Sequence, residues 1–153
     1  MEESIREINL KEREQKEKAA EKECRKEEAR NYSPLVLAFL GDSVYEREIR
    51  ERIVREGNAS PNELNRRSSL LAKASTQAAM AQALLSELTD EEVAIYRRGR
   101  NANPHTMAKN ATVADYRRAT GLEALMGYLF LCGEEARCRE LIGRGIEKTK
   151  DVQ

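Results

Sequence analysis

The chain has 153 residues, enough for one domain with a core and short for two, and its 27 basic and 27 acidic residues cancel. Zero net charge excludes general electrostatic attraction to nucleic acid, so any such affinity must come from local clusters. Three cysteines without zinc-ligand spacing, a single histidine and the lack of an apolar run of roughly 20 residues exclude a zinc site, a histidine-rich site within one subunit and a membrane span, and we expect a soluble cytoplasmic protein.

Residues 1–31 are expected to form a charged arm, distinct from a domain at residues 32–153. Acidic and basic side chains alternate in the arm, and its only large aliphatic residues after Met1 are Ile5, Ile8 and Leu10. No apolar heptad continues past Leu10, which argues against a coiled coil. Charge pairs four residues apart favour a solvated helix, and a frayed extension is the alternative. We expect a spacing role, with contact to a partner or to RNA left open.

From Ser33 onward the pattern predicts helices throughout, so the expected fold class is all-α. Proline occurs only at positions 34, 61 and 104, and no strand-like alternation of useful length is present. We expect helices over residues 34–56, 61–86, 90–99, 112–131 and 134–148, and an exposed loop over 100–111. Ser60 and Thr89 each precede a glutamate by three residues, which is the spacing of a capping box.

The first of these helices carries one acid, Asp42, beside Gly41 in an otherwise apolar run. In a helix, the neighbours of Asp42 at three, four and seven residues are mostly apolar, so we expect its carboxylate to be buried or nearly so. An ionised carboxylate that is isolated from water is usually neutralised, paired or bound to a metal. Asp42 therefore needs a partner in the folded chain.

The helix over 112–131 presents a second acid, Glu123, in the same setting of apolar and small neighbours. Two such acids on separate helices, each near a glycine that lets backbones approach closely, would meet and hold a hard cation such as Mg²⁺. On the residues alone, the alternative that each acid accepts a buried hydrogen bond or pairs with an arginine is equally open. This helix leaves little polar face, so it is either central or part of a subunit interface, and we expect a homodimer.

A local basic excess lies between Tyr96 and Arg118, where six basic side chains accompany the single acid Asp115. Neutral hydrogen-bonding side chains are interspersed, a mixture that grips phosphates and ribose hydroxyls without reading bases. The alternative is a solvated loop with ordinary salt bridges. Together with the two acids, the basic excess points to phosphodiester chemistry.

Several segments resemble the ribonuclease III family. The run LAFLGDSV at 37–44 resembles the signature helix of these enzymes, and LEALMGYLFL at 122–131 resembles their second catalytic helix. Further likeness to the Mini-III subgroup is carried by RRGRNA at 97–102, NEL at 62–64, RSS at 67–69 and Ala78 beside Gln77, with no double-stranded-RNA-binding domain appended. The resemblance covers the chain from about residue 32 onward.

This resemblance implies an all-helical, homodimeric endoribonuclease that cleaves double-stranded RNA with Mg²⁺, or with Mn²⁺ as a substitute. The expected substrate is the 23S ribosomal RNA precursor, and the expected products carry 5′-phosphate and 3′-hydroxyl ends. Asp42 and Glu123 match the catalytic acids that hold the metal, while Glu46 is a candidate outer ligand with a salt bridge as its alternative. The residues expected to contact RNA are Arg98, Arg100, Asn101, Lys109 and Asn110.

The chain departs from full-size ribonuclease III at three positions. Leu35 and Ala38 stand where the larger enzymes carry glutamates, and Thr120 stands where they carry an aspartate, losses that the Mini-III subgroup shares. The site is therefore expected to work with fewer carboxylates. The alternative functions are a catalytically silent duplex-RNA-binding or ribosome-assembly module and a helical dimeric scaffold.

Overall fold

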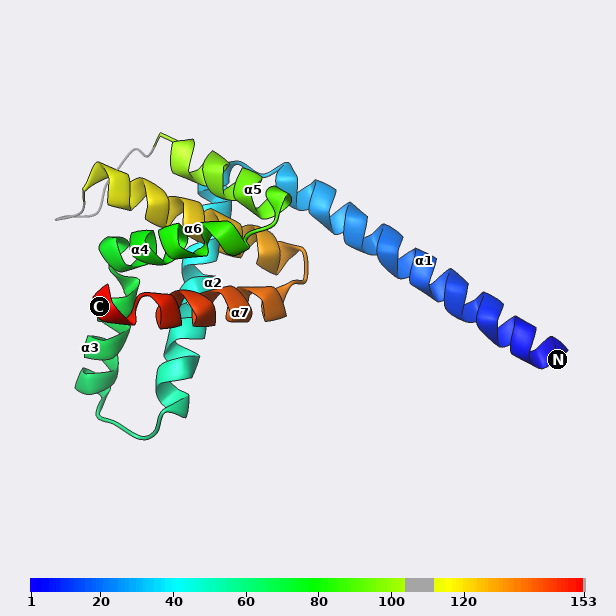
Figure 1. The fold of residues 1–153 in the computed structure, drawn as a ribbon, viewed down its shortest axis with the longest axis horizontal. Helices are drawn as coiled ribbons and strands as arrows, with labels where there is room; N and C mark the ends of the chain where they lie inside the picture. Colours follow the sequence, from blue (N-terminus) through cyan, green and yellow to red (C-terminus); the bar gives the residue numbers. More distant parts are fainter. Residues whose placement is uncertain (104–111, 153) are drawn as a thin grey trace.

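The computed structural model describes residues 1–103 and 112–152, and the regular elements in these ranges are all helical (Figure 1), which confirms the all-α prediction. The helices are α1 (Glu2–Arg30), α2 (Pro34–Arg55), α3 (Pro61–Ala72), α4 (Ala74–Leu84), α5 (Asp90–Asn101), α6 (Val113–Leu131) and α7 (Glu135–Lys148), with short 3₁₀ turns η1 (Leu85–Glu87) and η2 (Lys150–Val152). Within the same ranges, no helix combines the length and the apolar character that a bilayer crossing requires.

Two of the helix starts were predicted from capping boxes. At α5 the box is complete, because the Thr89 hydroxyl accepts from the Glu92 amide at 3.2 Å and the Glu92 carboxylate accepts from the Thr89 amide at 2.9 Å. At α3 the Ser60 hydroxyl accepts from the Glu63 amide at 3.2 Å, but the Glu63 carboxylate binds Arg66 instead of returning to the cap. Local hydrogen bonds therefore set both starts.

The predicted single helix over 61–86 is wrong, because the chain breaks at Lys73 into α3 and α4. Lys73 has an extended backbone, with φ −61° and ψ 142°. Carbonyl groups at the end of α3 find side-chain donors: the Thr76 hydroxyl donates to the Leu70 carbonyl at 2.8 Å, and the Tyr45 hydroxyl donates to the Leu71 carbonyl at 2.5 Å. These bonds satisfy groups that a continuous helix would pair internally, and the break turns α4 onto α6.

Helix α6 is the central element of the fold and makes its most extensive contacts with α2, followed by α5 and α4 (Figure 1). Of the two explanations for its apolar surface, the structure shows the central position, since ten residues of α6 between Ala119 and Leu129 are buried within the same chain. The largest fully buried side chains of the core are Tyr45, Tyr96, Tyr128, Leu37, Ile49, Met80, Leu84, Leu122, Leu125, Met126, Leu141 and Ile142.

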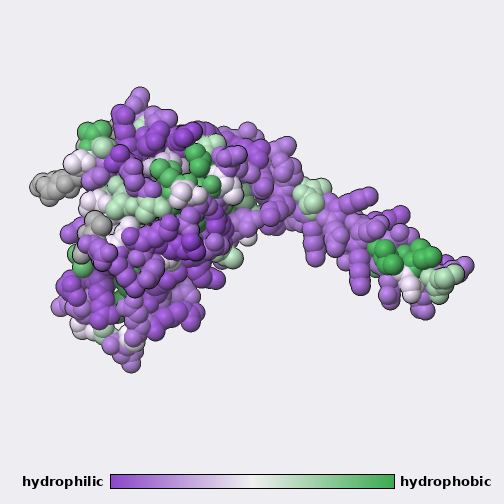
Figure 2. All heavy atoms as spheres, in the orientation of Figure 1, coloured by the Kyte–Doolittle hydropathy of each residue, from purple (hydrophilic) through white to green (hydrophobic). Residues whose placement is uncertain are grey.

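The charged N-terminal segment forms one continuous helix, α1, that projects from the body (Figure 1). Residues 1–25 are exposed throughout. Figure 2 shows a mostly hydrophilic surface along this helix, with its most strongly hydrophobic patch near the free end, where Ile5, Ile8 and Leu10 are each more than half exposed. Of the two alternatives for this segment, the helix is the one that forms.

Ion pairs hold the last two turns of α1 against the body. Lys22 pairs with Glu134 at 2.8 Å, and Glu91 at the start of α5 pairs with Lys26 at 3.4 Å and Arg30 at 3.2 Å. Isolated exposed pairs contribute little, but charges that share one carboxylate form a network with a defined geometry. The base of the arm is therefore fixed to α5 and to the start of α7.

Candidate functional site

The backbones of α2 and α6 cross in close contact at two glycines. A Cβ built on Gly41 would overlap the carbonyl oxygen of Glu123 and lie 2.8 Å from the Gly127 nitrogen. A Cβ built on Gly127 would overlap the carbonyl oxygen of Leu37 and lie 3.1 Å from the Gly41 nitrogen. Because the neighbouring atoms belong to the backbone, neither position has room for a larger residue. The crossing therefore fixes the spacing between the residues that flank it.

That crossing brings Asp42 of α2 and Glu123 of α6 to one pocket of about 360 Å³. Two acids that are far apart in the sequence thus line the same pocket. The rest of the lining comes from α2, α6 and the junction of α3 with α4, through Leu35, Ala38, Phe39, Ala72, Ala74, Gln77, Tyr116, Ala119 and Thr120. Most of these side chains are apolar or small, so the carboxylates dominate the chemistry of the pocket.

No arginine neutralises the two acids within the part of the chain that the structure describes. The arginines nearest to Asp42 in sequence are engaged elsewhere: Arg47 pairs with Glu135 at 3.5 Å, and Arg50 pairs with Glu46 at 3.4 Å. The alternative prediction was that each acid pairs with an arginine or accepts a buried hydrogen bond. Neither interaction is present among the described residues. No described residue supplies a cationic partner for the pair.

Both acids bind their protons more tightly than usual. Burial raises the pKa of Glu123 to about 8, and the charge of Asp42 adds to the increase. Burial also raises the pKa of Asp42, with a further contribution from Glu46. Two carboxyl groups that resist ionising together form an electrostatic arrangement that a bound cation would relieve.

The prediction that Asp42 is buried is wrong, because its side chain lies exposed at the rim of the pocket while Glu123 is partly buried within it. The reason is that none of residues 1–103 and 112–152 covers this face of α2. Phe39, one turn before Asp42 and also part of the lining, is 85% exposed. Asp42 thus opens to solvent on one side and faces Glu123 on the other.

Glu46 does not line the pocket. Its carboxylate pairs with Arg50 one turn further along α2, which is the salt bridge considered as the alternative to a ligand role. Among the described residues, no group of three or more histidine, cysteine, aspartate or glutamate side chains is arranged to hold a metal. Any cation site here would rest on two acids supplemented by neutral oxygen atoms or water.

Arg98, expected to contact RNA, lies at the junction of α1 and α2. Its guanidinium donates to the carbonyl of Arg30 at 3.3 Å and to the carbonyl of Tyr32 at 3.2 Å. The side chain thus secures the turn between two helices and keeps one exposed edge. Its part in holding the arm was not predictable from its charge.

Two of the other expected RNA contacts lie at the end of α5. Arg100 stacks over the Tyr96 ring, 5.8 Å from the ring centroid, and donates to the Asn101 side-chain oxygen at 3.3 Å. The stacking holds the guanidinium at the surface. Lys109 and Asn110 fall outside the described residues.

The structure adds one pocket residue that was not predicted, Gln77 of α4. It is only 4% exposed and lines the same pocket as the two acids. In the sequence, Gln77 is an amide in an alanine-rich helix. The sequence alone does not show which part of the molecule that side chain faces, because this depends on how α4 packs.

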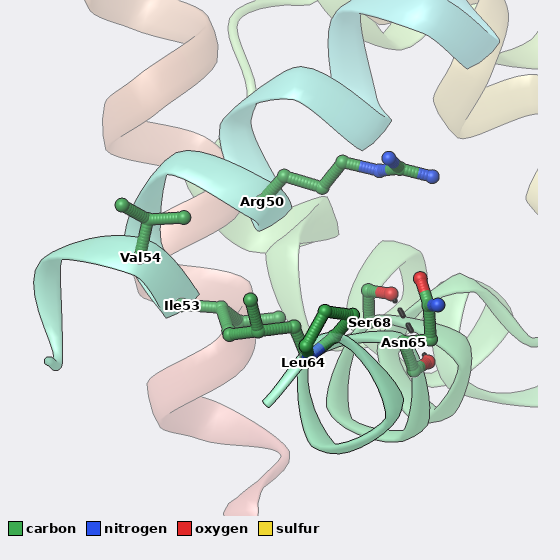
Figure 3. A pocket seen from close by; sticks show the side chains of 7 residues that line it. Arg50, Ile53, Val54, Leu64, Asn65 and Ser68 are labelled. Atoms are coloured by element: carbon green, nitrogen blue, oxygen red, sulfur yellow. Dashed lines mark hydrogen bonds between the residues drawn. The ribbon is translucent and has the colours of Figure 1, made fainter. Parts of the chain in front are cut away.

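A second pocket, of about 190 Å³, lies between the end of α2 and α3 (Figure 3). Ile53 and Leu64 line it, and the Ser68 hydroxyl there donates to the Asn65 carbonyl at 3.1 Å. Its lining contains no carboxylate, so it offers no counterpart to the acid pair.

Glu123→Gln is expected to stabilise the cation-free protein at pH 8, by up to about 4 kcal/mol in the free energy of unfolding. The pKa of Glu123 is about 8 in the folded chain against an ordinary value of 4.5, so the folded chain keeps a proton that the unfolded chain releases. Wild-type stability therefore falls as the pH rises from about 4.5 through about 8, whereas glutamine does not titrate.

Denaturation in a chelator at pH 5 and pH 8 measures this gap, which is expected to be larger at pH 8. Glu147→Gln, at a side chain that is 71% exposed, is the matched control and should leave the pH profile unchanged. Adding Mg²⁺ is expected to stabilise the wild type and not the glutamine variant. A gap that is independent of pH would contradict the electrostatic account.

Comparison with known proteins gives consistent matches. The Ribonuclease III domain family matches residues 35–134. The Mini-ribonuclease 3 of Enterococcus faecalis is 48% identical over 120 residues, which cover 77% of this chain and 91% of that protein. The Mini-ribonuclease 3 of Brevibacillus brevis is 43% identical over 110 residues, covering 72% and 82%. A crystal structure of a Fusobacterium nucleatum protein superimposes with a TM-score of 0.69 at 33% identity, over 77% of this chain and 94% of that one.

Proposed function

The chain belongs to the ribonuclease III family, among its Mini-ribonuclease 3 members, and from that premise we propose that it is a metal-dependent endoribonuclease that cleaves double-stranded RNA. The observation that carries the proposal is the pocket shared by Asp42 and Glu123, which have no cationic partner among the described residues. In a ribonuclease III family member, the role that best fits an acid pair without a cationic partner is to bind a divalent ion beside the phosphodiester.

The donor set fits Mg²⁺, since carboxylate oxygens are the ligands this ion prefers and it commonly retains several waters. Asp42 and Glu123 would hold the ion, with Mn²⁺ as a substitute, and Glu46 would act at most through water because it pairs with Arg50. When bound, the ion supplies charge neutralisation at the scissile phosphate and lowers the pKa of a water. Asp42, at the exposed rim, would face the incoming RNA, while Glu123 anchors the site from within.

RNA is proposed to approach along the end of α5, where Arg98, Arg100 and Asn101 lie exposed or partly exposed, and along the segment that contains Lys109 and Asn110. These side chains suit phosphate and ribose contacts without base readout. In line with the Mini-III resemblance, the proposed substrate is the 23S ribosomal RNA precursor and the proposed products carry 5′-phosphate and 3′-hydroxyl ends.

Incubation of the purified chain with long duplex RNA tests the proposal. Cleavage is expected with Mg²⁺ and not with chelator, and single-stranded RNA of the same sequence should survive. The alternative of a silent duplex-RNA-binding or ribosome-assembly module predicts salt-sensitive binding without cleavage in either metal. Intact duplex RNA in both Mg²⁺ and Mn²⁺ would therefore contradict the nuclease assignment.

A homodimer is also proposed, and the support comes from the uncovered face of α2. Val36 is 52% exposed and Phe39, one turn later, is 85% exposed. Large apolar side chains that neighbour each other on a helix surface are typical of an association surface. Because Phe39 also lines the acid pocket, a second copy seated on this face would border the site.

Phe39→Asp is expected to weaken dimerisation by about 100-fold or more, since burying a phenylalanine contributes about 1.5 to 3 kcal/mol and a charge in its place must be desolvated. Sedimentation velocity across a concentration series measures the change. Leu70→Asp, at an apolar residue that is 41% exposed on α3, is the control and should leave the dimer intact. A Phe39→Asp protein that dimerises like the wild type would exclude this face.

A further inference from the structure

Gln77 is a buried amide that faces the acid pocket. It is only 4% exposed, and it lines the pocket together with Asp42 and Glu123. Its backbone amide is used in the helix start, donating to the Lys73 carbonyl at 3.0 Å. Among the residues that the structure describes, its side-chain amide has no hydrogen-bond partner. The amide therefore faces the pocket without a partner from the described part of the chain.

The Gln77 residue is buried, but its amide is not sealed off from solvent, because it lines the open pocket, where water or a ligand can satisfy it. The break between α3 and α4 at Lys73 places Gln77 in the pocket, because it changes the direction of α4. The residues around it on α4 are mostly alanines, which need no polar partner. Packing within α4 therefore does not explain why an amide side chain occupies position 77.

The other neutral polar side chains of the pocket lining are the hydroxyls of Thr120 and Tyr116. The Thr120 hydroxyl donates to the Tyr116 carbonyl at 2.9 Å, one turn back along α6. Leu35 and Ala38 contribute only carbon atoms to the lining. Among the described residues of this lining, Gln77 is the one that offers an amide oxygen, a ligand type that Mg²⁺ and its waters accept readily.

We propose that the side-chain oxygen of Gln77 is the third protein group of the Mg²⁺ site, acting on the ion or on one of its waters beside Asp42 and Glu123. This inference rests on the proposed function and deepens it. A neutral amide oxygen adds a ligand without adding repulsion to the metal-free protein, whereas a carboxylate at this position would add repulsion that a bound cation offsets. Gln77 is thus a positioning residue that compensates for the small number of carboxylates.

The test compares Gln77→Met, which keeps the length and removes the amide, with Gln82→Met, an exposed glutamine on the same helix. Calorimetric titration with Mg²⁺ or Mn²⁺, without RNA, is the first measurement. Gln77→Met is expected to weaken metal binding by about 10-fold or more, in the range found for residues that support metal ligands, while Gln82→Met binds as the wild type does. Equal affinity in the Gln77→Met and wild-type proteins would overturn the proposal.

Thermal unfolding in chelator separates this role from a structural one. Removing an unpartnered amide is expected to leave the Tm of the metal-free protein unchanged or raised. If Gln77→Met lowers the Tm of the metal-free protein, the metal affinity of Gln77→Glu tests the proposal instead, because glutamate restores an oxygen atom on a side chain of the same length. It is expected to bind Mg²⁺ at least as tightly as the wild type, and weaker binding would refute the inference.

Asp42→Asn distinguishes a failure of this inference from a failure of the proposed function. If Asp42→Asn loses metal binding and cleavage while Gln77→Met keeps both, the nuclease assignment stands and the role of Gln77 falls. If the wild type itself neither binds Mg²⁺ nor cuts duplex RNA, the proposed function falls and the inference falls with it.

Discussion

Asp42→Asn is expected to slow the cleavage of duplex RNA by about a thousandfold or more, with little change in folding stability. A bound metal contributes several kcal/mol of transition-state stabilisation, and each 1.4 kcal/mol corresponds to roughly a factor of ten in rate. Asparagine keeps the shape of the side chain and removes the charge that would hold the ion. Because Asp42 lies exposed at the rim, the free energy of unfolding should change by less than about 1 kcal/mol.

Single-turnover cleavage at saturating Mg²⁺, together with circular dichroism, measures both quantities. Glu123→Gln is expected to lose activity to the same extent. Glu46→Gln, at a side chain that pairs with Arg50 outside the pocket, should lose less than about tenfold, in line with an outer role. Asp90→Asn, at an exposed acid on α5, is the control for a general loss of charge. Undiminished cleavage by both Asp42→Asn and Glu123→Gln would rule out the acid pair as the catalytic site.

Gly41→Ala is expected to destabilise the chain by about 2 to 3 kcal/mol and to reduce cleavage as well. The added Cβ would overlap the Glu123 carbonyl, so α2 and α6 must separate at their crossing. Overpacking of this kind costs about 1 to 3 kcal/mol or more and outweighs the gain of roughly 1 kcal/mol in helix propensity. The separation also moves Asp42 relative to Glu123, which explains the expected loss of activity.

Gly143→Ala is the matched control for this substitution. Its Cβ would meet only the guanidinium end of Arg52, which is flexible and able to move away. Its free energy of unfolding should stay near the wild-type value or rise. Denaturant unfolding of the two variants side by side tests the difference, and equal stability of Gly41→Ala and Gly143→Ala would contradict the close crossing.

The sequence was sufficient to predict most helix boundaries, because the signals for them are local. Thr89 with Glu92, and Ser33 before Pro34, act within one turn of the helices they start. The break at Lys73 was not predictable, because no glycine or proline marks it. It depends on a hydroxyl from another helix, that of Tyr45, which reaches the end of α3 only after the chain has folded.

For the candidate site, the pattern of an acid beside a glycine predicted the two residues that the fold brings to one pocket. The exposure of Asp42 was mispredicted, since helical neighbours indicate the face a residue shares but not whether another helix covers that face. Gln77 escaped prediction for the same reason. For charged residues, the sequence does not show which partner each side chain binds. The charge of Arg98, for example, did not indicate that its guanidinium donates to two backbone carbonyls.

The one-residue junction at Lys73 also determines where the chain can change in length. Each residue of an α-helix turns by about 100°, so an insertion or deletion at the junction would rotate all of α4. Gln77 would leave the pocket, and Met80 and Leu84 would leave the core in the same step. Residues 1–25 of α1 are exposed, and a change in their number disturbs no packing. Among natural variants of this chain, insertions and deletions should therefore accumulate in the arm and be absent from the α3–α4 junction.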